Sequence, residues 1–352
     1  MSKVCSKDLE RFCTDVMVRC GMETAQAGPV ARILAKSDRM GVFTHGTKLL
    51  RGYMKRMRAG GLRPKAKPTI TREGPAWAVV DGGSAMGQVA SITAMEIAMA
   101  KARSAGVGLV SVKNSCHFGA AGVYALMAAE QGMIGLAMSN DSPSMTAPGA
   151  RSHMMGTNPF AVAIPGGEEK PVLLDIAMST VAGSKVYAAV SQGKPIPNNW
   201  IVDQDGLPTT DAKCYPHSAS MVPMSGHKGY GLAIMVEVLS GLLSGGAIRW
   251  EICSWIFDKH DQPTNHCHAF LAIDVGQIVP MEWFRPRITG MIRDLRNSPK
   301  AKGSDRIFLP GEMEWEKFDV ANKEGLELPK DVMDNLVGLA QDVGLNLKDY
   351  FK

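Results

Sequence analysis

The chain has 352 residues, 45% of them hydrophobic and 21% charged, and its formal net charge is +5. A chain of this length can bury a large core, commonly arranged in two lobes. The small basic excess suits small anionic ligands and gives no reason to expect nucleic acid or a membrane as partner. No uninterrupted apolar run approaches the length that a membrane-spanning helix needs.

Apolar residues at helical spacing predict a helical lobe over about the first 70 residues. Leu9, Phe12 and Val16 share one face of a first helix, residues 24–37 form a second, and a third follows His45. The chain starts without the apolar run of a signal peptide.

Strands and helices alternate after this lobe. The pattern predicts strands at 76–81, 107–112 and 134–139, separated by helices at 86–104 and 118–131. Such alternation indicates an α/β core.

The second half of the chain begins with a loop-rich segment. We expect strands near 160–164 and 172–176, and later a long apolar helix at 229–243, a strand at 268–274 and an amphipathic helix at 331–343.

The number and spacing of the cysteines indicate the redox state of the protein's cellular compartment. The chain has seven, an odd number, without a CxxC pair. A disulfide scaffold is not expected in a chain of this size, so the sequence predicts reduced cysteines and a cytoplasmic protein.

The usual dinucleotide fingerprint is absent. No GxGxxG run connects a strand to a helix, which argues against a Rossmann domain. The run Gly226–Gly231 is glycine-rich, carries Lys228 and opens a predicted helix, whose free N–H groups attract anions. It lacks the spacing of a P-loop, and a plain helix start remains the alternative.

Two histidines share one local pattern. His45 follows Thr44, His117 lies between Ser115 and Gly119, and each precedes a predicted helix. The positive end of a helix lowers the pKa of a histidine toward values useful for proton transfer. Each histidine is therefore a candidate acid/base for ketone reduction, and local helix capping is the alternative.

A carboxylate substrate would also need a cation. Lys48 and Arg51 lie about one helical turn beyond His45, with Arg39 before it. They are candidate substrate-binding groups, together with Thr44; a solvated basic face is the alternative.

Two further clusters of side chains, one of cysteines and histidines and one of basic residues, are weaker candidates for a binding site. Cys253, His260, His266, Cys267 and His268 match no structural zinc spacing, so no metal site is predicted. The strongest basic cluster contains Arg285, Arg287, Arg293, Arg296, Lys300, Lys302 and Arg306. Without repeated aromatic residues it indicates a solvated helix face rather than a nucleic-acid site.

Taken together, the motifs resemble the malate/L-lactate dehydrogenase family, which lacks a Rossmann fold and also includes reductases of cyclic imino acids. The similarity runs nearly end to end. The matching segments, in family order, are GVFTHG at 41–46, NSCHFG at 114–119, MGTNP at 155–159, LDIAMS at 174–179, PTTD at 208–211, KGYG at 228–231 and LPGE at 309–312.

The resemblance implies roles for these segments. One of His117 and His45, preferably His117, would be the acid/base, and the other would place substrate or nicotinamide. The implied cofactor-binding residues are Ser139, Asp175, Ile176, Ala177, Met178, Ser179, Lys228, Gly229, Pro310, Gly311 and Glu312. Lys228 at a helix start suits pyrophosphate, and Asp175 at a strand end suits ribose or the nicotinamide amide.

Two positions depart from the family pattern. Many relatives have an arginine four residues after the first motif histidine, to hold the substrate carboxylate, whereas this chain has Leu49. Gly183-Ser184-Lys185 stands where relatives often have Arg-Gly-Lys. Both departures bear on the substrate more than on the reaction type.

The resemblance also implies the architecture: a mixed sheet flanked by helices, with a helical lobe built from both chain ends. We expect the helical lobe in residues 1–70 and 315–352, the α/β core in 71–140 and 226–314, and a loop-rich cofactor-binding segment in 141–225.

The sequence therefore predicts an oxidoreductase that uses NAD, with NADP still open, and interconverts a small anionic 2-oxo acid and its 2-hydroxy acid. The resemblance further implies a homodimer. Reduction of a cyclic imino acid, and a non-catalytic protein that binds anions or nucleic acid, are the alternatives.

Overall fold

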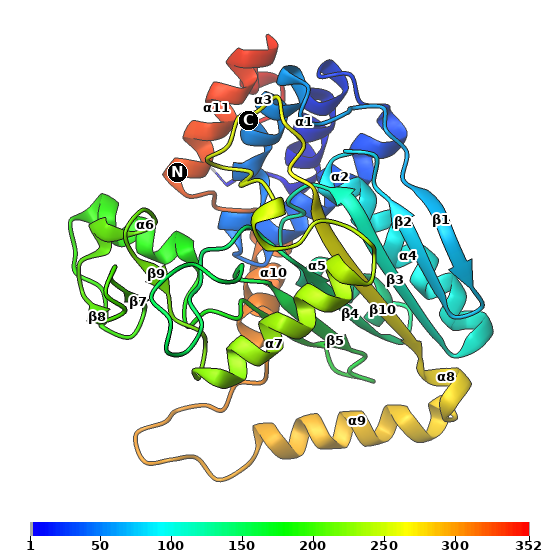
Figure 1. The fold of residues 1–352 in the computed structure, drawn as a ribbon. Helices are drawn as coiled ribbons and strands as arrows, with labels where there is room; N and C mark the ends of the chain where they lie inside the picture. The colour runs from blue at the N-terminus through cyan, green and yellow to red at the C-terminus, as the bar shows by residue number, and fades with distance from the viewer. Residues whose placement is uncertain (1–2, 352) are drawn as a thin grey trace.

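A seven-stranded sheet forms the centre of the structure, a computed structural model that describes residues 3–351 (Figure 1). The strands lie in the order β1-β2-β3-β10-β4-β5-β6. Their bounds, in that order, are Thr69–Gly74, Trp77–Asp81, Val107–Ser115, His266–Asp274, Met133–Ser139, Phe160–Ile164 and Val172–Ile176. Within residues 3–351, β2 and β3 form the one parallel pair of this sheet. The prediction of a mixed, non-Rossmann α/β fold is confirmed.

Helices cover both faces of the sheet. On one face lie α4 (Gly87–Ala105) and α5 (Gly122–Ala129), packed on alternate residues of β3, β10 and β4 such as Val110 and Phe270. On the other face lies α7 (His227–Glu237), which continues as a π-helix over Val238–Leu242. Alternate strand residues point to opposite faces, so a sheet covered on both sides has nearly continuous apolar strands.

A helical lobe packs beside the sheet and combines the two ends of the chain. Its core is apolar and joins residues from the first helices to residues from the last. The helices are α1 (Ser6–Arg19), α2 (Thr24–Arg39), α3 (Leu50–Ala59) and α11 (Lys330–Val343). α10 (Glu312–Glu324) contributes Ala321 to this core and inserts Trp315 into the core of the sheet.

A smaller lobe stands apart from the main sheet (Figure 1). It contains α6 (Gly183–Gln192) and a three-stranded sheet in the order β8-β7-β9, with its own apolar core. Those strands are Pro208–Thr209, Ile201–Val202 and Ser220–Met221. The sequence patterns missed α6 and these strands.

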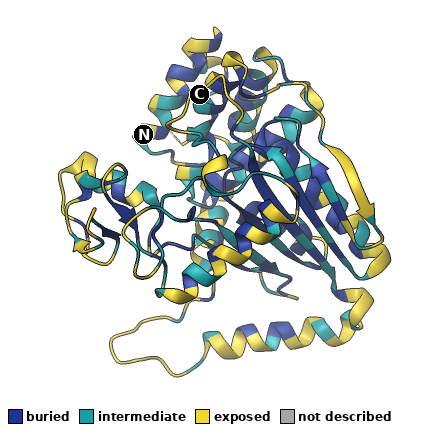
Figure 2. Cartoon of the chain, viewed as in Figure 1, coloured by how far each residue is buried: buried dark blue, intermediate teal, exposed yellow. Residues whose placement is uncertain are grey.

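The region after β10 projects from the body. It contains α8 (Val275–Ile278) and α9 (Met281–Arg296), and Figure 2 shows exposed residues along α9 and the connection that follows it. Among residues 3–351, no helix has both the length and the apolar content needed to cross a bilayer.

The predicted helix 118–131 starts later than expected. α5 begins at Gly122, because Gly119 adopts a left-handed φ of +85° that turns the chain before the helix. The proposed division at residues 70, 140, 226 and 315 stays a prediction; β5 and β6 of the middle segment belong to the main sheet.

Candidate active site

The two motif histidines lie side by side. His45 ends a short 3-10 turn, Phe43–His45, and His117 follows β3; their ring centroids are 5.8 Å apart with an interplanar angle of 28°. Gly119 allows this approach, because a Cβ at that position would lie 3.1 Å from the His45 carbonyl oxygen. Two segments far apart in the sequence therefore meet at one point.

The expected cause of the lowered histidine pKa is wrong. α3 starts at Leu50 and α5 at Gly122, so neither His45 nor His117 lies at the start of an α-helix. Burial lowers the pKa of His45, and burial together with nearby histidines holds the pKa of His117 well below its usual range. Both shifts favour the neutral imidazole, the form that a proton acceptor requires.

His117 has a tightly defined environment. Tyr53 Oη lies 2.7 Å from His117 Nδ1, and the Trp255 ring stacks on the imidazole with centroids 4.5 Å apart. His117 Nε2 makes no hydrogen bond to the residues that the structure describes. The ring is therefore held at one nitrogen and open at the other, which suits proton exchange with a ligand.

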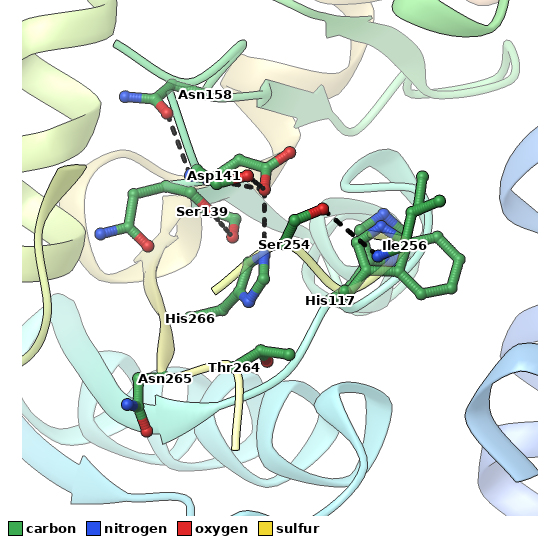
Figure 3. A network of polar contacts seen from close by, with 12 residues as sticks. His117, Ser139, Asp141, Asn158, Ser254, Ile256, Thr264, Asn265 and His266 are labelled. Carbon is green, nitrogen blue, oxygen red and sulfur yellow. Dashed lines mark hydrogen bonds and ion pairs between the residues drawn. The ribbon is translucent and has the colours of Figure 1, made fainter. Parts of the chain in front are cut away.

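A second polar network lies beside His117 (Figure 3). His266 Nε2 lies 3.1 Å from Asp141 Oδ1, and the Asp141 N–H donates to Asn158 Oδ1 over 3.1 Å. The His266 ring lies edge-on to His117, with centroids 6.5 Å apart. Asp141 therefore contacts His266 beside His117, and its charge opposes the lowering of the His45 pKa.

Ser139, predicted to bind cofactor, lies inside the protein. Its hydroxyl is 2.9 Å from His268 Nδ1 and donates to the carbonyl of Asn140 at 2.8 Å. The other nitrogen of His268 is 2.8 Å from Ser115 Oγ. In this structure Ser139 fixes His268, a fully buried histidine.

A buried carboxyl supports the loop that carries His45. Asp38 of α2 is fully buried, and its Oδ2 accepts hydrogen bonds from the N–H and the hydroxyl of Thr47. Its Oδ1 has no partner among residues 3–351, and a Cβ on Gly46 would overlap that atom. Burial raises the pKa of Asp38 to about 7, against the opposing effect of Thr47.

The two predicted substrate-binding cations, Lys48 and Arg51, contact α11 in this structure rather than the histidines. Lys48 Nζ is 2.6 Å from Asp331, and Arg51 makes two contacts with Asp342, so both pair with carboxylates of α11. Thr44 stays with the histidines, since its hydroxyl lies 2.9 Å from His45 Nδ1.

Two predicted cofactor segments converge at the end of β6. Gly229 packs against the carbonyl oxygens of Met178 and Met224 so closely that a Cβ would not fit. This contact joins the Asp175–Ser179 segment to the start of α7, where Lys228 is exposed and forms no ion pair within residues 3–351. The arrangement leaves a free cation at a helix N-terminus.

Asp175 connects this region to the histidines. Its Oδ2 accepts the Gly122 N–H at 2.7 Å, at the end of the loop that starts from His117. Asp175 is exposed, yet desolvation by the protein around its carboxyl raises its pKa to about 6, opposed by the hydrogen bond from the Gly122 N–H.

The other residues of the Asp175–Ser179 segment use their polar groups in hydrogen bonds within the protein or lie half-buried. The Met178 N–H donates to the Thr157 carbonyl, and Ser179 Oγ donates to the Val181 carbonyl. Ile176 ends β6 and Ala177 follows it, both half-buried.

The predicted Pro310–Glu312 turn packs on β6 as well. The Pro310 carbonyl accepts the Leu173 N–H at 3.0 Å, and Gly311 leaves no room for a Cβ beside Leu173. Glu312 accepts from the Leu309 N–H and pairs with Arg296 and Arg306. Pro310 and Glu312, with Arg296 and Arg306, border a pocket of about 160 Å³.

The basic cluster at 285–306 and the cysteine and histidine cluster at 253–268 are the two remaining groups from the sequence. Arg293, Arg296 and Arg306 of the basic cluster form ion pairs with glutamates. No group of three or more metal-ligating side chains lies together in the described part of the chain.

Sequence patterns missed several groups at the site. Tyr53, Trp255 and Asp141 belong to no motif that singles them out, although Tyr53 lies on the apolar face of the predicted third helix. That face was the one signal available for Tyr53.

Comparison with known proteins identifies the family. The model of the malate/L-lactate dehydrogenase family matches residues 4–337. The chain is 36% identical over 341 residues to a malate dehydrogenase of Pyrococcus horikoshii, covering 95% of this chain and 93% of that protein. It is 34% identical over 347 residues to an L-sulfolactate dehydrogenase of Methanocaldococcus jannaschii, covering 97% and 98%.

A solved structure agrees along the whole fold. The crystal structure of malate dehydrogenase from Entamoeba histolytica aligns with a TM-score of 0.92 at 32% identity, covering 98% of this chain and 99% of that one. With the paired histidines in place, these likenesses confirm the expected resemblance: the chain belongs to the malate/L-lactate dehydrogenase family.

Proposed function

We propose that this chain is a nicotinamide-dependent dehydrogenase that oxidises a small 2-hydroxy acid to its 2-oxo acid, and catalyses the reverse. The observation that carries the proposal is the His45–His117 pair, whose rings lie 5.8 Å apart and whose pKa values are lowered by burial. Neutral imidazoles can accept the hydroxyl proton as the carbon is oxidised.

His117 is the preferred proton acceptor. For Nε2 to take a proton, Nδ1 must carry its own hydrogen and donate it to Tyr53 Oη, which lies 2.7 Å away. His45 then orients the substrate beside it. In the reverse direction, the proton on His117 Nε2 returns to the alkoxide oxygen.

The residues at the end of β6 fit a nicotinamide cofactor. The positive end of the α7 dipole and Lys228, which has no ion pair within residues 3–351, suit a pyrophosphate, and the Asp175 carboxyl, beside Gly122, suits a hydroxyl or amide donor. When bound, the cofactor supplies the acceptor and donor of hydride. NAD is the form we propose.

An absorbance assay at the NADH band tests the function. We expect NADH oxidation with at least one of oxaloacetate, pyruvate and sulfopyruvate. Turnover of a cyclic imine carboxylate alone would reassign the chain to imine reduction. Absence of turnover with all of these, from folded protein that binds NADH, would contradict both assignments.

We also propose that the protein is a homodimer in the cytoplasm. Exposed apolar residues on α7 and its continuation, including Met235, Leu242 and Leu243, and on α9, including Trp283, suit burial against a second copy. All seven cysteines are free, as in a reducing compartment. A sedimentation mass equal to one chain would contradict the dimer.

A further inference from the structure

The Trp255 side chain covers the candidate acid/base. Its ring stacks on His117 with centroids 4.5 Å apart and an interplanar angle of 18°, and on Tyr53 at 5.4 Å and 26°. Trp255 lies in the loop 254–262, which has no helix or strand to fix its course. Its position on the imidazole needs another explanation.

Arg56 of α3 explains how this loop holds Trp255 in place. Its side chain is among the largest fully buried ones, with 1% of the residue exposed. It forms no ion pair with the described residues; instead its guanidinium donates to five backbone carbonyls of this one loop. The acceptors are Trp255 at 2.8 Å, Ser254 at 2.8 Å, Asp258 at 3.1 Å, Lys259 at 3.2 Å and Gln262 at 3.2 Å.

Every N–H of this guanidinium is used. Nε donates once, and each of the two terminal nitrogens donates twice. A buried charge without a counter-ion is costly unless hydrogen bonds satisfy it, and a planar fork of five donors fixes the direction of each acceptor. The loop is therefore built around Arg56.

The end of α3 holds the same loop at a second point. Gly61 follows the helix, and a Cβ there would overlap the carbonyl oxygens of His260 and Gln262. One turn before Arg56, Tyr53 contacts His117 directly. A single helix thus reaches the imidazole by two routes, through Tyr53 and through the loop.

We propose that Arg56 is a positioning residue for the reaction: it shapes the loop 254–262 so that Trp255 covers one part of the His117 ring and keeps water from it. This inference rests on the proposed role of His117. Arg56 itself touches no reacting atom.

The proposal predicts the titration of His117. Loss of the Trp255 cover hydrates the imidazole and raises its pKa toward the ordinary value of about 6.5. The charged or titratable groups that face His117 from neighbouring elements are His45, Tyr53, Cys116, His266 and His268, with Asp141 behind His266. All of these side chains remain in variants at Arg56 and Trp255; Arg56→Lys keeps the charge that acts on Cys116, and Trp255→Phe keeps an aromatic ring beside Tyr53.

The experiment is an NMR titration of the full chain with ¹³C-labelled histidine, using His117→Gln to assign the resonance. Arg56→Lys keeps the charge but cannot form the five-donor fork. We expect Arg56→Lys and Trp255→Ala each to raise the pKa of His117 by about one unit or more. Trp255→Phe, which restores an aromatic cover, should stay near the wild-type titration.

The controls separate positioning from stability. Arg58→Lys, on the same helix, changes an exposed arginine that donates to one backbone carbonyl, and should leave the titration unchanged. The double variant Arg56→Lys/Trp255→Ala should titrate like Trp255→Ala, because both changes act through one ring. A lower melting temperature in Arg56→Lys with a wild-type titration of His117 would overturn the proposal.

The Trp255 variants decide the matter if Arg56→Lys does not fold: a wild-type titration in Trp255→Ala overturns the proposal, and a raised pKa that Trp255→Phe reverses supports it. The titration needs no turnover. A shifted His117 in an enzyme whose activity does not follow that pKa would uphold this inference and refute the proposed role of His117.

Discussion

Replacing His117 with asparagine should lower turnover about 100- to 10,000-fold, the range that a general acid/base contributes. The reason is that Nε2 is the free nitrogen of a ring otherwise held by Tyr53 and Trp255. Asparagine removes the titrating group without adding bulk. NADH affinity should change little, because the proposed cofactor residues lie at the end of β6 and the start of α7. Steady-state kinetics and NADH fluorescence titration measure the two effects.

The matched control is His153→Asn. His153 is half-buried like His117, but its Nε2 contacts the carbonyl of Ala219 near the small lobe. This variant should keep wild-type turnover. Near-normal turnover in both His117→Asn and His45→Asn would refute the histidine mechanism.

Replacing Lys228 with methionine should weaken NADH binding about 10- to 100-fold, equal to about 1–3 kcal/mol for a charge-assisted contact. Lys228 is exposed at the start of α7, so methionine creates no buried defect. Turnover at saturating NADH should remain close to wild type, because the lysine is not assigned to the proton transfer. Equilibrium binding at fixed salt gives the affinity.

Two comparisons sharpen this test. Lys228→Arg keeps the charge and should retain most of the affinity, while Lys7→Met removes an exposed lysine from α1 and should have no effect. An unchanged NADH affinity in Lys228→Met would remove this residue from the proposed cofactor site.

The sequence predicted the two histidines because each lies in a compact local motif. It could not predict the contacts around them, since Trp255 comes from an irregular loop and Asp141 from the residues after β4. The helix-end explanation failed because Gly119 turns the chain before α5 begins. Lys48 and Arg51 lie close to His45 in sequence, yet they pair with α11, which no local pattern reveals.

In the fold too, local patterns were predictable from the sequence and long-range pairings were not. Apolar runs predicted most of the strands of the main sheet, because burial on both faces leaves a strong signal. β10 lies between β3 and β4 although it follows them by more than a hundred residues, and pairing of this kind is not encoded locally. The strands of the small lobe have two residues each, too few for any periodicity.

The buried carboxyl of Asp38 links folding to acidity. Its pKa is about 7 in the fold, against an ordinary value of 3.8, so the native state binds this proton more tightly than the unfolded chain does. The resulting stabilisation is complete below about pH 4 and is lost as the pH rises through about 7, a difference on the order of 4 kcal/mol. Urea unfolding of wild type and Asp38→Asn at pH 5 and pH 8 should show this loss in wild type, and a flat response at this site in the variant. The support beneath His45 is therefore firmest in acid, while burial favours the neutral form of His117.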